Sequence, residues 1–185
     1  NRCSYCAIPL IRGSMVSRRL VNVVNEARSL AGLGVKELIV VAQDPTRYGP
    51  DTEGTHTLPR LVEQLGRIEG IEWLRIMYAH PDRWEVLRDA ITASEKALPY
   101  ADMPVQHASR AVLSRMGRAG DSEKYLLAIE DIRKAVPGIS LRSTFMVGFP
   151  GESESDFAEL TQFIRTASFE HAGVFIFSPA EGTVA

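Results

Sequence analysis

The sequence is poor in cysteine and has neither a long apolar run nor a marked excess of charge of one sign. Two cysteines in 185 residues exclude a disulfide-based scaffold and fit a reducing cytoplasm, where we expect the protein to act. No apolar run is long enough to cross a membrane, and the first residues do not resemble a signal peptide. A net charge of −2 gives no general attraction for nucleic acid.

The two cysteines that are present lie together, as Cys3 and Cys6 in a C-x-x-C pair. Thiolates are soft ligands, and such a pair can hold one metal ion or one edge of an iron–sulfur cluster. Two thiolates do not complete a four-coordinate site. Three interpretations therefore remain open: a thioredoxin-like redox motif, half of a structural zinc site, or a cluster loop whose first ligand precedes Asn1. Because Asn1 is not an initiator methionine, we expect the chain to be a fragment.

Alternating strand and helix patterns fill the rest of the chain, which is 45% hydrophobic and of a length that fits one domain, 1–185. We expect a helical N-cap at Ser17, because an apolar repeat at spacings of three and four follows it. Helices are predicted at 17–31, 58–68, 84–93, 111–116, 123–136 and 153–166. Strands are predicted at 37–42, 71–78, 100–103, 139–147 and 174–177.

This order of elements predicts an α/β fold with parallel strands and right-handed crossovers, either an open doubly wound sheet or a barrel. No G-x-G-x-x-G follows a strand, so the dinucleotide-binding sheet is the weaker choice. Polar residues gather directly after the strands, among them Gln43, His80, Gln106 and Ser178. In a barrel the active site is built at that carboxyl-terminal rim.

The chain contains several short runs that are specific when taken together. They are Arg-Cys-Ser-Tyr-Cys-Ala-Ile-Pro at 2–9, Val-Ala-Gln-Asp at 41–44, Thr-Arg-Tyr-Gly at 46–49, Leu-Pro-Tyr at 98–100, Met-Gly-Arg at 116–118 and the stretch 142–152 that ends in Gly-Phe-Pro-Gly-Glu. Together they resemble the methylthiotransferases, a branch of the radical S-adenosylmethionine (SAM) enzymes, and residues 2–9 resemble the last part of that family's C-x-x-x-C-x-x-C loop. The resemblance covers nearly the whole chain and implies a partial (βα)6 TIM-like barrel, whose first strand and first cluster cysteine would precede Asn1.

The resemblance also implies cofactors, partners and a site. The implied cofactors are a 4Fe-4S cluster, SAM and a second 4Fe-4S cluster that an N-terminal domain holds. The implied partner is an electron donor such as flavodoxin, and a C-terminal domain would help to hold the substrate. We expect both domains to lie outside this chain. The implied cluster ligands are Cys3 and Cys6, and the implied SAM-binding residues are Tyr5, Gln43, Gln106, Arg142, Gly148 and Phe149.

Several of these residues also have a structural interpretation. Gln106 can hold a ribose hydroxyl or stabilise its loop, and Arg142 can bind the methionine carboxylate or pair with a structural acid. Tyr5 can pack on the cofactor or belong to the core. His107 is a candidate substrate contact, or a hydrogen-bonded wall residue.

The substrate is suggested by residues 106–109, which read Gln-His-Ala-Ser. At this position the resembling family members that modify an aspartate of a small-subunit ribosomal protein also read Gln-His-Ala-Ser, whereas those that act on tRNA adenosines usually read Gln-Ser-Gly-Ser. We therefore expect a methylthio group to be added to the β-carbon of that aspartate. The alternatives are an isopentenyl- or threonylcarbamoyl-adenosine of tRNA and, in another class, a non-catalytic metal-binding barrel.

Overall fold

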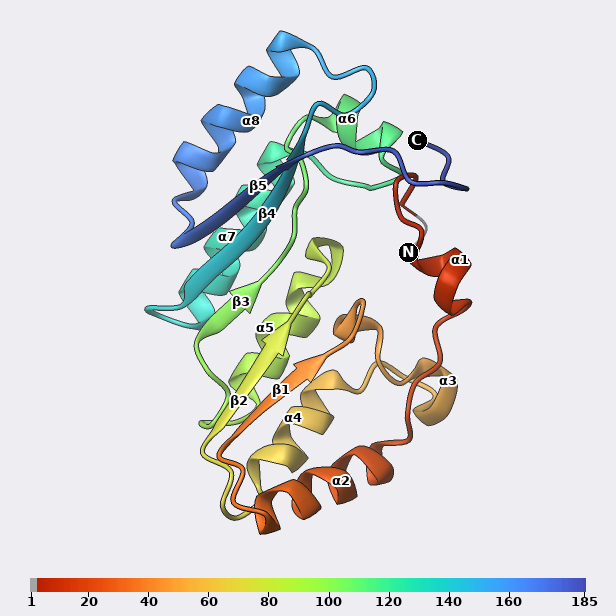
Figure 1. The fold of residues 1–185 in the computed structure, drawn as a ribbon. Helices are drawn as coiled ribbons and strands as arrows, with labels where there is room; N and C mark the ends of the chain where they lie inside the picture. Colours follow the sequence, from red (N-terminus) through yellow and green to blue (C-terminus); the bar gives the residue numbers. More distant parts are fainter. Residues whose placement is uncertain (1–2) are drawn as a thin grey trace.

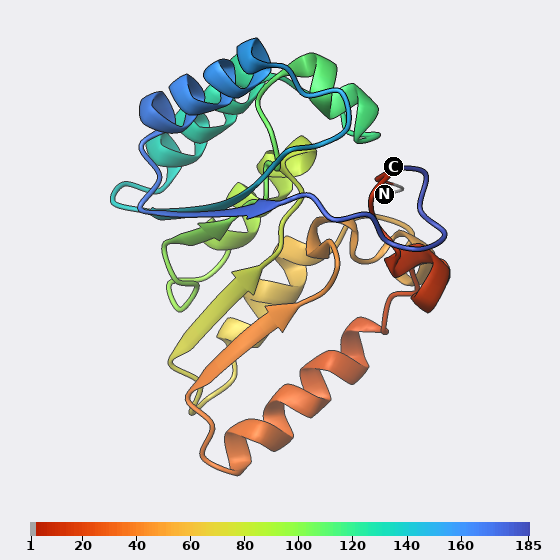
Figure 2. The same ribbon diagram turned by 45° about the horizontal axis from the view of Figure 1, so that its top comes forward.

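A computed structural model of the chain describes residues 3–185; Asn1 and Arg2 lie outside the described residues. Figures 1 and 2 show a curved sheet with helices packed along one face and both chain ends at its carboxyl-terminal side. The strands are β1 (Glu37–Val41), β2 (Trp73–Met77), β3 (Tyr100–Asp102), β4 (Ser140–Val147) and β5 (His171–Ile176). The five strands predicted from the sequence are therefore all present, in the predicted order.

All pairings between the strands are parallel and follow the chain order. The pair β1 and β2 forms one ladder, and β3, β4 and β5 form another. The two ladders are joined by a parallel bridge between Leu74 of β2 and Ala97, which precedes β3, and by the hydrogen bond from Ala79 N, just after β2, to Asp102 O of β3 (2.9 Å). Parallel strands in sequential order that curve in this way form an open barrel wall, as predicted.

The helices come between the strands and supply the outer layer. Their buried residues recur at spacings of three and four, as in α4, where Leu58, Leu61, Val62 and Leu65 face the sheet. Together with Leu74, Leu87, Ile132, Leu141 and Phe145 they form the main core. The helices are α1 (Ile8–Arg12), α2 (Leu20–Gly32), α3 (Pro50–Glu53), α4 (Leu58–Gly66), α5 (Trp84–Thr92), α6 (Arg110–Arg115), α7 (Ser122–Ala135) and α8 (Glu154–Ala167).

The predicted N-cap at Ser17 is wrong. Helix α2 begins at Leu20, and its N-cap residue Arg19 makes no side-chain cap. Ser17 instead turns toward the loop after β1: its backbone N–H donates to the Asp51 carboxylate (2.6 Å), and its hydroxyl accepts from Gly49 N (3.1 Å). A tertiary contact therefore replaces the local capping interaction that the sequence suggested.

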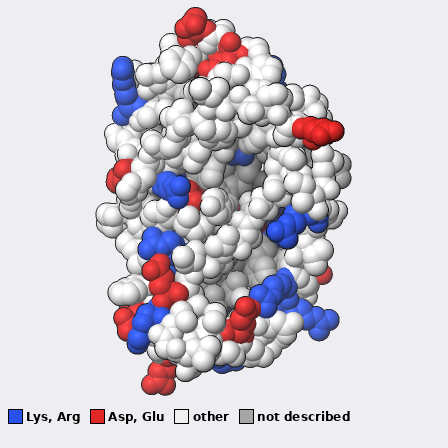
Figure 3. All heavy atoms as spheres, viewed as in Figure 1, with Lys and Arg blue, Asp and Glu red and all other residues white. Residues whose placement is uncertain are grey.

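The face of the sheet away from the helices stays open. Along β4, Leu141, Ser143 and Phe145 are buried on one side, whereas Arg142 and Thr144 alternate with them and point to the other side. Figure 3 shows that the molecule is hollowed along the middle of the face seen in Figure 1, with acidic and basic side chains interspersed around the hollow. Within residues 3–185, no helix has both the length and the apolar character needed to cross a bilayer.

Candidate cofactor site at the carboxyl ends of the strands

The cysteine loop is fastened to the end of α6. Ser4 N donates to Met116 O (2.9 Å), and the Ser4 hydroxyl donates to Arg115 O (2.8 Å). Within the loop, Cys6 N donates to Cys3 O (3.1 Å), which makes a tight turn between the two thiols. The chain's last residues return to the same place, since Val184 N donates to Ser4 O (2.9 Å). Both cysteines are free thiols and partly exposed, so they are available as ligands.

Aromatic rings connect this loop to the ends of β4 and β5. The Tyr5 ring lies edge-on to Phe149, with centroids 6.4 Å apart, and Phe149 lies edge-on to Phe177 at 5.1 Å. Met116 and Met146 complete this apolar cluster. Burial raises the pKa of the Tyr5 phenol above its ordinary value, so its hydroxyl stays neutral at pH 7. The structure thus brings together two of the residues predicted to bind the cofactor.

The loop from Gly148 to Gly151 closes over the end of β4. Gly148 and Gly151 have φ values of 72° and 80°, which a glycine adopts without steric cost. Glu152 fixes the turn, because its carboxylate accepts from Phe149 N (3.0 Å) and its backbone N–H donates to Phe149 O (2.9 Å). Arg115 also donates to Gly151 O (2.8 Å). The same helix end therefore supports the glycine loop and the cysteine loop.

His107 lies behind the glycine loop and has no exposed surface. Its Nδ1 accepts from Ser109 N (3.0 Å), and its Nε2 is 3.7 Å from the Glu152 carboxylate, too far for a hydrogen bond. Burial lowers the pKa of this imidazole, and the nearby Glu152 carboxylate opposes that shift. The geometry favours the wall-residue interpretation, and direct contact with a substrate stays a prediction.

Gln106 has an unusual conformation and an unsatisfied side chain. Its φ is 73°, a left-handed value that is uncommon outside glycine. The backbone is nevertheless well bonded, because Gln106 N donates to Thr144 O (2.9 Å) and Gln106 O accepts from Met146 N (2.8 Å). Its side-chain Oε1 is buried without a hydrogen-bond partner among the described residues. A buried acceptor of this kind needs a donor from outside the chain or from water.

Two of the predicted cofactor-binding residues lie apart from this cluster. Gln43 is exposed and follows β1, at the same end of the sheet as the cysteine loop. Arg142 is the third residue of β4, five residues before its end and thus about 16 Å along an extended strand. Asp102 is its register partner, and a hydrogen bond to Tyr100 together with that carboxylate raises the pKa of Arg142. This placement favours pairing with a structural acid.

Arg118 belongs to the site although the sequence assigned it no role. Its Nη1 lies 3.8 Å from Cys3 Sγ, and its Nη2 donates to Pro104 O (2.8 Å). Its Nε is buried without a partner among residues 3–185. No local pattern could have identified this contact, because Arg118 and Cys3 are far apart in the chain; the Met-Gly-Arg run at 116–118 was the only signal.

The residues of this site can supply part of the ligand set of an iron–sulfur cluster. Cys3 and Cys6 supply two soft thiolates. Among residues 3–185, no group of three or more Cys, His, Asp or Glu side chains is gathered to hold a metal ion. A partly buried guanidinium beside Cys3, whose Nε–H is buried and unpaired among residues 3–185, suits an anionic group at this place.

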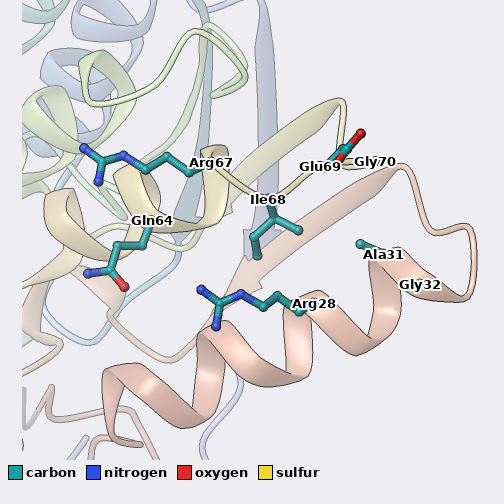
Figure 4. A pocket seen from close by; sticks show the side chains of 8 residues that line it. All are labelled: Arg28, Ala31, Gly32, Gln64, Arg67, Ile68, Glu69 and Gly70. Carbon is teal, nitrogen blue, oxygen red and sulfur yellow. The ribbon is translucent and has the colours of Figure 1, made fainter.

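A separate groove of about 500 Å³ lies at the opposite end of the sheet, where α2 and α4 end and the strands begin. Figure 4 shows Arg28 on α2 and both Gln64 and Arg67 on the α4 side of this groove. None of the predicted site residues lines it. We therefore assign the candidate site to the carboxyl-terminal end of the strands.

The amino-acid sequence matches a family model and the sequences of known proteins. The model of the Radical SAM superfamily matches residues 1–164. A Moorella thermoacetica protein named ribosomal protein uS12 methylthiotransferase RimO is 53% identical over 186 residues, which cover 100% of this chain and 43% of that protein. A Clostridium tetani protein of the same name is 47% identical, covering 100% of this chain and 42% of its own length. The chain thus spans less than half the length of these relatives.

Two solved structures share the fold at low sequence identity. Coproporphyrinogen III oxidase (HemN) from Escherichia coli, described as a radical SAM enzyme, has a TM-score of 0.70 and 16% identity over 96% of this chain and 42% of its own. Streptococcus suis SuiB bound to S-adenosylmethionine has a TM-score of 0.66 and 14% identity over 99% of this chain and 39% of its own. These likenesses confirm the fold.

Proposed function

The chain belongs to the radical SAM superfamily, and from that premise we propose that it is the catalytic domain of a methylthiotransferase that modifies a small-subunit ribosomal protein. The observation that carries the proposal is the 53% identity, across the whole chain, to a protein named for the methylthiolation of ribosomal protein uS12. The Gln-His-Ala-Ser run at residues 106–109 supports the same branch of the family.

A bound four-iron cluster and SAM would supply a carbon radical able to remove hydrogen from an unactivated carbon. Cys3 and Cys6 would be two of the cluster ligands. The Tyr5, Phe149 and Phe177 rings would form an apolar wall that keeps water from the reacting group. None of these residues has to act as an acid or a base, which agrees with the lack of a paired-carboxylate or Ser-His-Asp arrangement in the sequence.

Gln106 and the glycine loop would hold SAM in place. The orphan Oε1 of Gln106 can accept a hydrogen bond from a ribose hydroxyl. The loop around Gly148 offers backbone groups at the end of β4, beside the Phe149 ring. Gln43 would reach SAM from the end of β1. Arg142, which lies nearer the start of β4, would face the open side of the sheet, where a substrate or the methionine carboxylate can approach.

We extend the proposal to groups outside this chain. The modified atom is the β-carbon of an aspartate, the sulfur comes from a second 4Fe-4S cluster in an N-terminal domain, and the electron comes from a donor such as flavodoxin. Such a reaction belongs in the cytoplasm, where its ribosomal substrate is made. Within residues 3–185 we find support for the first cluster site only.

The test incubates the full-length protein, reconstituted anaerobically with iron and sulfide, with SAM, a reductant and purified ribosomal protein uS12. A parallel reaction contains hypomodified tRNA, and a Cys6→Ala protein serves as control. We expect mass spectrometry to find a methylthio group on one aspartate of uS12, and none in the control reaction. Label on a tRNA adenosine alone would assign the chain to the tRNA branch. Stoichiometric zinc and no product would favour a non-catalytic barrel.

A further inference from the structure

Arg118 occupies a position between the cysteine loop and the segment that leads to Gln106. Its guanidinium reaches from Cys3 Sγ, at 3.8 Å, to Pro104 O, at 2.8 Å. Its backbone is held as well, since Arg118 N donates to Leu113 O (2.8 Å) at the end of α6. The cysteine loop is fastened to the same helix end through Ser4. The guanidinium is therefore fixed relative to the thiols and cannot swing away freely.

No acidic side chain of residues 3–185 makes an ion pair with this guanidinium. Two ionisable groups near it, Tyr125 and His80, are uncharged at pH 7. Burial raises the pKa of Tyr125 to about 12. Burial and the Arg118 charge together lower the pKa of His80 to about 4. Arginine cannot lose its proton in a protein. The cation is thus partly buried and has no hydrogen-bonded or ion-paired carboxylate among residues 3–185, an arrangement that favours the binding of an anion.

We propose that Arg118 is a positioning residue that provides the counter-charge for an anionic iron–sulfur group held by Cys3 and Cys6, and that it raises the reduction potential of that group. The proposal rests on the proposed function. One-electron reduction adds a negative charge to the cluster, and a fixed cation a few ångströms away favours the reduced form. An N–H directed at a ligating sulfur acts in the same direction, because hydrogen bonds to sulfur and net charge set cluster potentials.

A purely structural role of Arg118 would not depend on its charge. Arg118 would then only hold the Pro104 carbonyl and fill space. Replacing Arg118 with Gln removes the charge but keeps a polar side chain with N–H donors, whereas Lys keeps the charge and loses the planar fork. The two variants therefore separate charge from shape. Arg110→Gln is the matched control, because Arg110 begins α6, the helix that precedes Arg118, and its side chain is 81% exposed.

The experiment is a redox titration of the full-length reconstituted protein, followed by electron paramagnetic resonance. The loop's cluster is defined as the signal that disappears in the Cys3→Ala/Cys6→Ala double variant. At the wild-type midpoint we expect Arg118→Gln to lower the ratio of reduced to oxidised cluster about tenfold, a shift of about 59 mV for one electron. We expect Arg118→Lys to stay within about twofold of wild type and Arg110→Gln to match it.

An unchanged midpoint in Arg118→Gln, or an equal shift in Arg118→Lys, would overturn the proposal. If Arg118→Gln folds by circular dichroism but holds no cluster, iron retained by Arg118→Lys supports the proposal, and iron lost from both refutes it. If Arg118→Gln does not fold, the ratio of reduced to oxidised cluster in Arg118→Lys at the wild-type midpoint decides: a value within about twofold of wild type supports the proposal, and a change of about tenfold refutes it. A wild-type protein without the cysteine-dependent signal would instead contradict the proposed function, so the two failures are distinguishable.

Discussion

The ring of Tyr5 stands edge-on to the ring of Phe149, with their centroids 6.4 Å apart. This contact joins the cysteine loop at the start of the chain to the glycine loop after β4. Phe149 in turn touches Phe177, which follows β5, so one ring connects three segments of the rim. Phe149 is only 3% exposed, and the rim therefore depends on it for packing as well as for shape.

We predict that Phe149→Ala lowers the free energy of unfolding by about 3 kcal/mol, because it removes a buried ring and leaves a cavity. Urea denaturation followed by circular dichroism measures the change. The matched control is Phe157→Ala on α8, where the ring is 48% exposed and the expected loss is below about 1 kcal/mol. Equal losses in the two variants would show that Phe149 is not a packing centre of the rim.

Gln106→Ala is expected to separate cofactor binding from stability. The substitution removes a buried acceptor that has no partner, so the free energy of unfolding should stay within about 0.5 kcal/mol of wild type or rise. If the side chain accepts a hydrogen bond from SAM, the dissociation constant for SAM should increase about tenfold. Gln162→Ala, an exposed glutamine on α8, is the control. A loss of stability with unchanged SAM affinity would instead support the loop-stabilising role of Gln106.

The capping box of α8 makes stability depend on pH. The Asp156 carboxylate accepts from the Ser109 and Ser153 hydroxyls and from Ser153 N, and these bonds lower its pKa to about 2. Because the pKa is lower in the folded protein than in the unfolded chain, protons bind preferentially to the unfolded chain. The stabilisation is present above the unfolded pKa of about 3.9 and is lost as the pH falls toward 2.

Asp156→Asn should therefore cost about 1 kcal/mol at pH 7, and the difference from wild type should disappear as the pH falls from 4 to 2. Urea unfolding at a series of pH values measures this difference. Glu154→Gln removes a charge from the same helix turn and controls for general repulsion. A wild-type advantage that persists at pH 2 would mean that the carboxylate charge is not what stabilises the helix start.

Sequence patterns located β1 because it is an apolar run between turn residues, and the parallel ladder then fixed the edges of the strands. Strand β5 shows the limit: the predicted start was residue 174, but pairing with β4 carries the strand back to His171. Neither His171 nor Gly173 favours a strand by itself, so the neighbouring strand decides. Ser17 failed as a cap for the same reason, since Gly49 and Asp51 compete for it.

The site was predictable where the residues form a local motif. Tyr5 and Phe149 belong to recognisable loops, and the fold brings these loops together. Arg118 was missed because its significance comes from a contact with Cys3 across the fold, and its own surroundings in the sequence look like an ordinary helix end. For Arg142 the sequence left two roles open, and its position beside Asp102 favours the structural one.

The central claim is that Cys3 and Cys6 hold the cluster on which the reaction depends, and reductive cleavage of SAM tests it most directly. The full-length protein, reconstituted anaerobically, is mixed with SAM and dithionite, and the formation of 5′-deoxyadenosine and methionine is measured. We predict both products for wild type and background levels for Cys3→Ala and for Cys6→Ala. Cleavage at the wild-type rate in either variant would contradict the account.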